Sequence, residues 1–158
     1  MESETQIERI LDRCTPENLS PRRVGAGIFI GIITYMSVID MGFLDGLPAE
    51  WRSEVLEFLR GERREFSFVP EVEGTDFQRA VLIEMMKIPY GEVKSYGELA
   101  RLAGYPRAAR AVGSVCRNNK YPIIIPCHRV VASNGLGGYA FGLEMKKELL
   151  KIEGVVFS

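Results

Sequence analysis

Hydrophobic residues are distributed differently in the two halves of the chain. From Gly25 to Ile39 they form an Ile- and Val-rich run that is broken by Gly31, which predicts a β-hairpin or two adjacent strands. From Pro48 to Leu59 the apolar residues recur at helical spacing, which predicts a helix with Pro48 at its first position. The first half is therefore predicted to contain strands followed by a helix.

Two helix-start motifs and a pair of helix-ending residues organise the second half. Thr75-Asp76-Phe77-Gln78 fits a T-x-x-Q capping box, which predicts a helix that runs to about Met86 and ends before Pro89 and Gly91. Ser95-Tyr96-Gly97-Glu98 fits an S-x-x-E box and predicts a second, shorter helix.

A third predicted helix follows the second after a tight turn. The second helix is expected to turn Leu99 and Leu102 inward and to end at Gly104. Pro106 suits the first position of a third helix that runs to about Asn118. Two helices joined by such a short turn are typical of a helix-turn-helix, although an ordinary αα-hairpin has the same pattern.

The two faces of this third helix, residues 106–118, differ in character. One face is apolar and is predicted to pack inward, whereas the other is basic but built from small residues, so that its backbone could approach a partner closely. The inward set is Ala108, Ala109, Val112, Val115 and Cys116, and the outward set is Arg107, Arg110, Ala111 and Ser114.

Charge divides the chain in the same way. The 158 residues allow one domain or two small ones. Residues 1–74 carry 8 basic and 14 acidic side chains, whereas residues 75–158 carry 12 and 7. The basic second half favours an acidic partner, although two domains with unrelated surfaces would give the same asymmetry. A Pro/Gly/Glu-rich stretch from Val69 to Gly74 predicts the boundary, which gives domains of residues 1–72 and 73–158.

Composition excludes several classes of protein. Three cysteines are too few for a disulfide scaffold, and a structural zinc site would need all three together with the only histidine. The longest uncharged run, Val24 to Ile39, has 16 residues, which is shorter than the ~20 of a membrane span. The N-terminus is acidic, unlike a signal peptide. We therefore expect a cytoplasmic protein with reduced thiols, no metal site and no membrane contact.

The sharpest chemical signal is Pro126-Cys127-His128-Arg129-Val130. It follows Ile123-Ile124-Ile125, which predicts a short buried strand or extended segment. A cysteine is a useful nucleophile only as the thiolate, and a neighbouring imidazole and guanidinium favour that form. The alternative is a buried structural cysteine beside a surface histidine.

The predicted C-terminal helix supplies a partner for the histidine. Lys146, Leu149, Leu150 and Glu153 fall on one face, and Gly154 is expected to end the helix. A carboxylate on an apolar face needs a partner, and the only histidine is the obvious candidate. The alternative is that Glu153 lies in solvent at a fraying helix end.

From Thr75 to Gly154 the chain resembles the O6-alkylguanine–DNA alkyltransferases, also called methylated-DNA–protein-cysteine methyltransferases. The resemblance implies an α/β plus α fold, in which a small N-terminal RNase H-like α/β domain precedes a helical domain with a helix-turn-helix. The residues that carry it are Phe77-Gln78, Ile88-Pro89, Gly91, Ser95-Tyr96-Gly97, Ala108 to Gly113, Asn119, Ile125 to Val130, Tyr139 and Glu153-Gly154.

The resemblance also implies catalytic roles. Cys127 would accept the alkyl group, and His128 would deprotonate it through a water while Glu153 holds the imidazole. Tyr96 would donate a hydrogen bond to the flipped guanine, and Lys146 would be a supporting donor.

Further positions are implied to support the acceptor segment or to contact DNA. Asn119 would brace the turn that leads to Cys127, and Arg110 would enter the duplex in place of the extruded base. The backbone at Val130 and Ala140 would read the guanine edges. The remaining implied substrate contacts are Ser95, Ser114 and Tyr139.

The implied function is DNA repair by direct damage reversal. An alkyl group would pass irreversibly and stoichiometrically from O6 of guanine, or O4 of thymine, to Cys127, with no cofactor. The protein would act as a monomer and bind double-stranded DNA through the minor groove by the 106–118 helix. Phe141 stands where some relatives have a small residue, and its ring is expected to disfavour large alkyl groups.

Three alternatives remain at this stage. One is a relative that binds alkylated DNA without repairing it, which would require loss of activity despite the presence of Cys127. Another is a transcriptional regulator, although the small outer residues Ala111, Gly113 and Ser114 suit major-groove readout poorly. A cysteine hydrolase is disfavoured because adjacent Cys127 and His128 rarely reach mutual hydrogen-bond geometry.

Overall fold

The computed structural model describes residues 42–155, so residues 1–41 and 156–158 lie outside the described part. The strands predicted between Gly25 and Ile39 fall outside it, and only residues 42–72 of the RNase H-like domain predicted over residues 1–72 lie within it. The described elements are η1 (Leu44–Gly46), α3 (Ala49–Leu59), α4 (Asp76–Met86), β1 (Lys94–Ser95), α5 (Tyr96–Leu102), α6 (Ala109–Arg117), η2 (Cys127–Arg129), β2 (Val130–Val131) and α7 (Leu143–Ile152).

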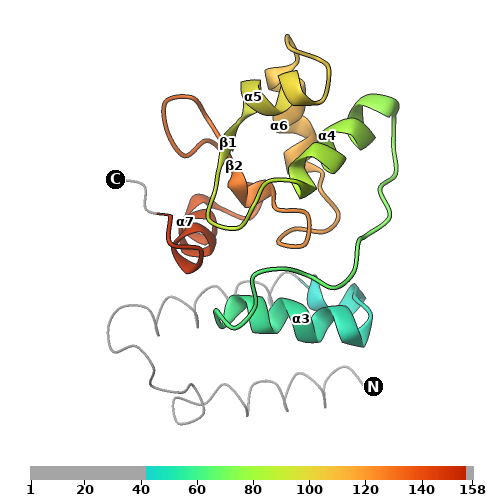
Figure 1. Cartoon of the computed structure of the whole chain (residues 1–158), viewed down its shortest axis with the longest axis vertical. Helices are drawn as coiled ribbons and strands as arrows, with labels where there is room; N and C mark the ends of the chain where they lie inside the picture. Colours follow the sequence, from blue (N-terminus) through green and yellow to red (C-terminus); the bar gives the residue numbers. More distant parts are fainter. Residues whose placement is uncertain (1–41, 156–158) are drawn as a thin grey trace.

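The described helices fall into two groups, which are joined by a long connection (Figure 1). The first group is α3 with α7, and the second is α4, α5 and α6, which contact one another. Strand β1 pairs in parallel with β2, so that Lys94 lies opposite Val130 and Ser95 opposite Val131. The sheet thereby joins the start of α5 to the end of the Cys127 turn.

The predicted starts of α3, α4 and α5 are confirmed, with two differences in detail. Thr75 and Gln78 form a reciprocal capping box at the start of α4. Ser95 Oγ accepts a hydrogen bond from the Glu98 amide at 3.1 Å, which is one half of the second predicted box. The predicted helix from Pro48 to Leu59 is confirmed as α3, although Pro48 is its N-cap rather than its first residue.

Two predictions about the helix-turn-helix are wrong in part. Leu99 is fully buried, but Leu102 is 54% exposed, because α5 ends at this residue after two turns. The third helix begins at Ala109 rather than Pro106. Residues 105–108 instead form a turn in which the Ala108 amide donates to the Tyr105 carbonyl at 3.0 Å.

The predicted strand at Ile123-Ile124-Ile125 is also wrong, although all three residues are buried. The chain makes a tight turn there, with Ile123 at a φ of 76°. The Asn119 side chain closes this turn, since its Nδ2 donates to the Ile125 carbonyl at 2.9 Å and its Oδ1 accepts from the Tyr121 amide at 3.0 Å.

Two hydrophobic clusters meet at this turn. The first packs α3 against α7 and buries Ile123 and Ile124, and the second packs α4, α5 and α6 around Ile125. Cys127 belongs to the second cluster, whereas Leu149 of the C-terminal helix belongs to the first. The acceptor segment therefore lies where the two clusters adjoin.

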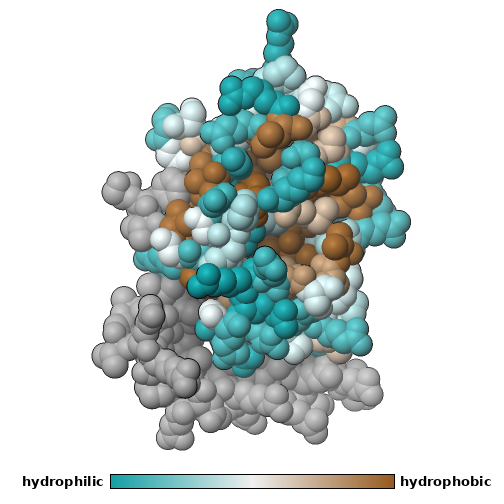
Figure 2. All heavy atoms as spheres, in the orientation of Figure 1, coloured by the Kyte–Doolittle hydropathy of each residue, from teal (hydrophilic) through white to brown (hydrophobic). Residues whose placement is uncertain are grey.

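The surface shown in Figure 2 carries hydrophobic residues over the region of α4, α5 and α6, separated by hydrophilic side chains. Ile83, Leu102 and Tyr105 are exposed hydrophobic residues from these elements and the turn that follows α5. None of the helices within residues 42–155 is long and apolar enough to cross a membrane.

Candidate acceptor site

Cys127 begins the short 3-10 helix η2, directly after the turn that Asn119 closes. Its side chain is buried, and its residue exposure is only 3%. Burial raises the pKa of the Cys127 thiol, whereas polar interactions with Asn119 and Tyr139 and the charge of Lys146 act in the opposite direction. Because burial is the largest cause, the thiol is protonated at neutral pH and needs a base before it can react.

His128 and Glu153 form the predicted pair, and the predicted burial of Glu153 is confirmed. Both side chains are fully buried, and His128 Nε2 binds Glu153 Oε2. The neutral imidazole therefore carries its proton on Nε2 and leaves Nδ1 as an acceptor. Nδ1 is buried and has no hydrogen-bond partner among the residues that the structure describes.

The motif predicted that the Arg129 guanidinium would act on the thiol. Its hydrogen bonds instead go to the second oxygen of Glu153 and to a backbone carbonyl. Its Nε donates to Glu153 Oε1 at 2.8 Å, and its Nη1 donates to the Ile88 carbonyl at 2.7 Å. The Gly91 amide donates to the same Oε1 at 2.8 Å. Burial alone would raise the pKa of Glu153, but its partners His128, Arg129 and Gly91 lower it overall, so the carboxylate is ionised.

Glu153 by itself would favour a cationic imidazole, but its effect on His128 is outweighed. Burial lowers the pKa of His128 more than the hydrogen bond and charge of Glu153 raise it, and the charges of Arg129 and Lys146 lower it further. The buried carboxylate already balances the charge of Arg129. His128 is consequently neutral at pH 7, which is the form that can accept a proton.

Lys146 is fully buried in α7 and bridges two neighbouring segments. Its Nζ donates to the Val130 carbonyl at 2.6 Å and to the Gly138 carbonyl at 2.9 Å. Burial lowers the pKa of Lys146 to about 8. The ammonium group also lies 6.0 Å from the centre of the Tyr96 ring, which places both side chains on the same side of the site.

Tyr96 begins α5 and packs against the loop that precedes α7. Its hydroxyl is 3.4 Å from the Gly138 carbonyl. A Cβ atom on Gly137, which has a φ of 74°, would lie 2.9 Å from that hydroxyl and 3.0 Å from the Ala132 amide nitrogen. Only glycine therefore allows this loop to approach Tyr96 so closely.

The remaining predicted residues lie around this centre or on the face of α6. Tyr139 packs against the second hydrophobic cluster, which contains Cys127, and its ring contacts the Phe141 ring edge to face at 5.6 Å. Ala140 and Phe141 are exposed. On α6, Arg110 and Ala111 are exposed, whereas Ser114 is half-buried and its hydroxyl accepts from Arg117 at 3.1 Å. Ser95 is half-buried beside β2.

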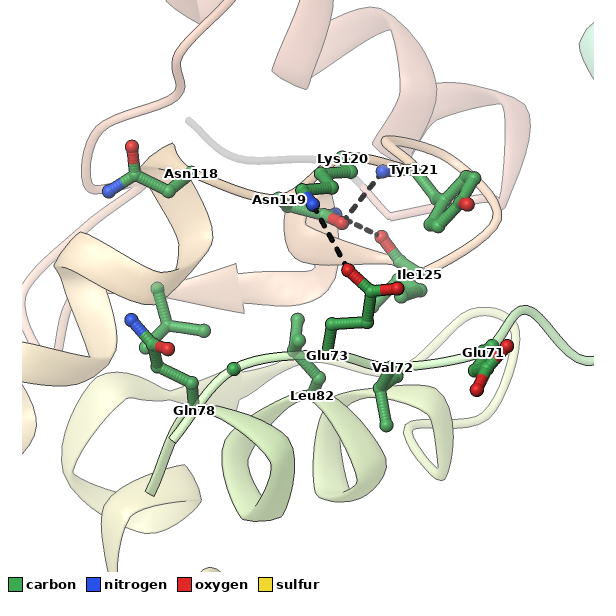
Figure 3. A pocket seen from close by; sticks show the side chains of 12 residues that line it. Glu71, Val72, Glu73, Gln78, Leu82, Asn118, Asn119, Lys120, Tyr121 and Ile125 are labelled. Carbon is green, nitrogen blue, oxygen red and sulfur yellow. Dashed lines mark hydrogen bonds and ion pairs between the residues drawn. The ribbon is translucent and has the colours of Figure 1, made fainter. Parts of the chain in front are cut away.

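A pocket of about 490 Å³ adjoins the turn that precedes Cys127. Figure 3 shows it between the segment before α4, helix α4 itself and the residues that follow α6. It shares Asn119 and Ile125 with the acceptor turn, but neither Cys127 nor Tyr96 lines it. The pocket is therefore separate from the thiol.

Sequence reasoning found most of these residues but missed the bonds that Arg129 and Gly91 donate to Glu153, and the bond from the Tyr90 hydroxyl to the Ile152 carbonyl. A buried carboxylate has two oxygens and can accept from more than one donor. Because Arg129 directly follows the histidine, its position in the sequence could have indicated this second donor. Among residues 42–155, no group of three or more His, Cys, Asp or Glu side chains could hold a metal ion.

The chain is similar to known proteins in both sequence and structure. Residues 76–155 match the family model described as "6-O-methylguanine DNA methyltransferase, DNA binding domain". The methylated-DNA–protein-cysteine methyltransferase of Methanosarcina acetivorans is 48% identical over 98 residues, which cover 61% of this chain and 63% of that protein. The protein of the same name from Mycobacterium leprae is 40% identical over 132 residues, covering 77% and 80%.

Solved structures agree with the sequence matches. The crystal structure of Mycobacterium tuberculosis OGT in complex with DNA has a TM-score of 0.65 and 42% identity, and covers 67% of this chain and 65% of that one. The O6-methylguanine-DNA methyltransferase of Pyrococcus kodakaraensis has a TM-score of 0.60 and 36% identity, with coverages of 78% and 81%. The mixed fold, mostly helical with a small parallel sheet, is thus shared. On this basis the chain belongs to the methylated-DNA–protein-cysteine methyltransferase family.

Proposed function

We propose that this chain repairs alkylated DNA by direct reversal of the damage. It transfers a methyl or other alkyl group from O6 of guanine, and from O4 of thymine, irreversibly to Sγ of Cys127. The observation that carries this proposal is the buried Cys127-His128 pair with Glu153 on the imidazole. It lies within the residues that match a DNA-binding domain of this family.

The reaction begins with removal of the thiol proton. His128 is neutral and holds its own proton toward Glu153, so Nδ1 is the atom that receives the proton of Cys127, through a water. The resulting imidazolium lies beside the ionised carboxylate of Glu153, which stabilises it. Asn119 braces the turn that holds the sulfur in place.

The second step is a displacement at the alkyl carbon. The Cys127 thiolate forms the new carbon–sulfur bond while the carbon–oxygen bond to the base breaks, and the electron pair passes to the base. The Tyr96 hydroxyl donates to the leaving base and stabilises its developing charge. Lys146 is a supporting donor that also holds the Val130 and Gly138 carbonyls in position.

The product is a thioether, which is a poor leaving group. The proposed chemistry uses no second nucleophile to remove it and no cofactor. Each molecule therefore reacts once, and the amount of alkyl group transferred cannot exceed the amount of active protein.

Access to the damaged base requires that the nucleotide leave the stack, at a cost of a few kcal/mol. We assign this step to α6, whose exposed face of small residues enters the minor groove, with Arg110 filling the space of the extruded base. Backbone groups at Val130 and Ala140 contact the base. Ser95, Ser114 and Tyr139 complete the substrate contacts.

The wider organisation is part of the same proposal. Residues 1–72 form an RNase H-like α/β domain, and residues 73–158 form the domain that binds double-stranded DNA and accepts the alkyl group. The protein acts as a monomer in the cytoplasm. The Phe141 ring, which contacts Tyr139, limits the size of the alkyl group that is accepted.

The test uses duplex DNA with a labelled O6-methylguanine, in excess over the protein. Methyl transfer is expected to plateau at one group per active molecule, to persist in chelator, and to place the added mass on the Cys127 peptide. Cys127→Ala should bind the duplex and transfer nothing, whereas the matched Cys116→Ala variant should react. Continued turnover, or label on Cys116 with Cys127 unmodified, would contradict the proposal.

A further inference from the structure

Tyr90 lies between α4 and β1 and contacts the charged groups beneath the acceptor site. Its hydroxyl donates to the Ile152 carbonyl at 2.9 Å. Ile152 is the last residue of α7 and immediately precedes Glu153. The next residue after Tyr90, Gly91, donates its amide to the Glu153 carboxylate at 2.8 Å. Two bonds from adjacent residues therefore fix both the backbone and the side chain at the end of α7.

The ring of Tyr90 makes a second set of contacts. The guanidinium carbon of Arg129 lies 5.8 Å from the ring centre, and that of Arg64, from the segment after α3, lies 5.3 Å from it. Both distances are within the range of cation–π attraction. Arg129 is the residue that neutralises Glu153, so the ring helps to hold the cation whose position sets the charge next to His128.

Phe58 of α3 links the same ring to the histidine. It is fully buried and meets Tyr90 edge to face at 5.9 Å and His128 edge to face at 6.2 Å. Tyr90 therefore contacts Phe58, which meets the imidazole, and Arg129, which meets the Glu153 carboxylate, yet the proposed reaction does not use it.

We propose that Tyr90 is a positioning residue for alkyl transfer, which fixes Glu153 and Arg129 relative to His128. This inference rests on the proposed function, because it assigns to His128 the role of base. Without the hydroxyl, the end of α7 and the Glu153 carboxylate are less well fixed. Without the ring, Arg129 also loses a contact that directs it toward Glu153.

The single histidine makes the charge network directly measurable. Four charged groups act on the pKa of His128 or of Tyr90: Lys146 of α7, Glu153 at the C-terminal end of that helix, Arg129 of η2 and Arg64 after α3. Burial keeps the pKa of His128 low, so displacement of Arg129 and entry of water should both raise it. A residue that only contributes packing elsewhere would leave this titration unchanged.

The experiment compares Tyr90→Leu and Tyr90→Phe with Tyr121→Phe as the matched control, because Tyr121 packs against the same cluster and its ring contacts Trp51. Single-turnover methyl transfer and the NMR titration of the histidine ring are measured for each. Tyr90→Leu should slow transfer about tenfold to a hundredfold and raise the histidine pKa. Tyr90→Phe, which keeps the ring, should lose only about fivefold, and Tyr121→Phe should resemble the wild type.

Several outcomes would overturn the inference. Wild-type transfer in both Tyr90 variants would do so, as would slow transfer with an unchanged histidine titration in Tyr90→Leu, which would indicate packing alone. If Tyr90→Leu does not fold, the loss in Tyr90→Phe relative to Tyr121→Phe decides. Failure of the wild-type protein to transfer methyl groups would refute the proposed function instead, and the histidine titration would still test whether Tyr90 fixes the network.

Discussion

Glu153 is a single carboxylate whose two oxygens serve different partners. Oε2 binds His128, whereas Oε1 accepts from Arg129 and from the Gly91 amide. The sequence placed Glu153 on an apolar helix face and predicted its pairing with the histidine, which the structure confirms. The sequence could not predict that Arg129 would also bind this carboxylate, because His128 and Arg129 could equally have been partners of the Cys127 thiol.

Replacement of Glu153 with Gln should therefore act on reactivity and on stability together. Arg129 would remain buried without a counter-charge and would make His128 less basic, so the pH at which Cys127 becomes reactive should move upward. Loss of one partner of a buried ion pair should also cost about 3–5 kcal/mol of unfolding free energy. Single-turnover rates across pH and urea unfolding would measure the two effects.

Glu148→Gln provides the matched control for this variant. Glu148 is another buried carboxylate of α7, and its ion pair is with Lys151 at 3.7 Å rather than with the acceptor site. Its replacement should leave the pH profile unchanged. Equal pH profiles for Glu153→Gln and the wild type would show that the carboxylate does not act through His128.

Cys116 gives a second prediction at this scale. Burial raises its pKa to about 12, so the thiolate fraction at pH 8 is about a thousandfold below that of an ordinary exposed cysteine. Iodoacetamide should label Cys116 very slowly in the folded protein and rapidly in urea. Mass spectrometry of the Cys116 peptide measures both rates, and rapid labelling without denaturant would contradict the raised pKa of this half-buried thiol.

At the scale of single elements, the helices that carry their own caps were the most predictable. Thr75 and Ser95 each accept a hydrogen bond from the backbone three residues later, and this interaction is local in sequence. Helix α6 lacks such a cap, since no side chain of Ala108 can accept a bond from the helix amides. Its start was consequently misplaced at Pro106, which occupies a turn instead.

The exposed face of α6 leads to a prediction for Arg110. Arg110→Ala should react roughly tenfold more slowly with duplex substrate, because the cost of flipping a base is a few kcal/mol, but nearly normally with the free modified base. Arg107→Ala is the control, since Arg107 is an exposed cation in the turn before α6 and should weaken binding without affecting the flipping step. Equal slowing of Arg110→Ala on both substrates would exclude the proposed insertion.

At the scale of the whole described molecule, elements far apart in sequence build the site together. Helix α7 packs against α3 in one cluster while its last turn presents Glu153 to η2 in the other. The connection between α3 and α4 is held as well, because Glu54 accepts from the Ser67 amide and hydroxyl and pairs with Arg63. The boundary expected near residue 72 therefore lies in a segment whose first part is bound to α3.

Stability should depend on pH in a manner set by the one histidine. The pKa of His128 is lowered in the folded protein, so below about pH 6.5 the unfolded chain binds a proton that the folded protein does not. The free energy of unfolding should fall as the pH decreases through this range, with a slope approaching about 1.4 kcal/mol per pH unit. Glu153, whose pKa is lowered from 4.5, contributes stability that is lost only at more acidic pH.

Urea unfolding between about pH 5 and 7 measures this slope for the wild type and for His128→Gln. The variant should be less stable at neutral pH, because the bond to Glu153 changes, but its stability should vary little across the same range. A wild-type curve as flat as that of the variant would mean that the pKa of His128 is the same in the folded and unfolded states, which would contradict a buried, neutral imidazole.

The sequence alone determined much of the local structure and supplied the candidates for the reacting groups. Capping boxes, helix-ending glycines and the apolar face of the last helix depend on neighbours a few residues apart, and the Cys-His-Arg motif is contiguous. Only the tertiary structure decided what these groups do to one another. The charge state of His128 depends on burial between segments up to about a hundred residues apart. Burial and shared partners are properties of the packed molecule, because the free energy of a charge is set by everything around it rather than by its neighbours along the chain.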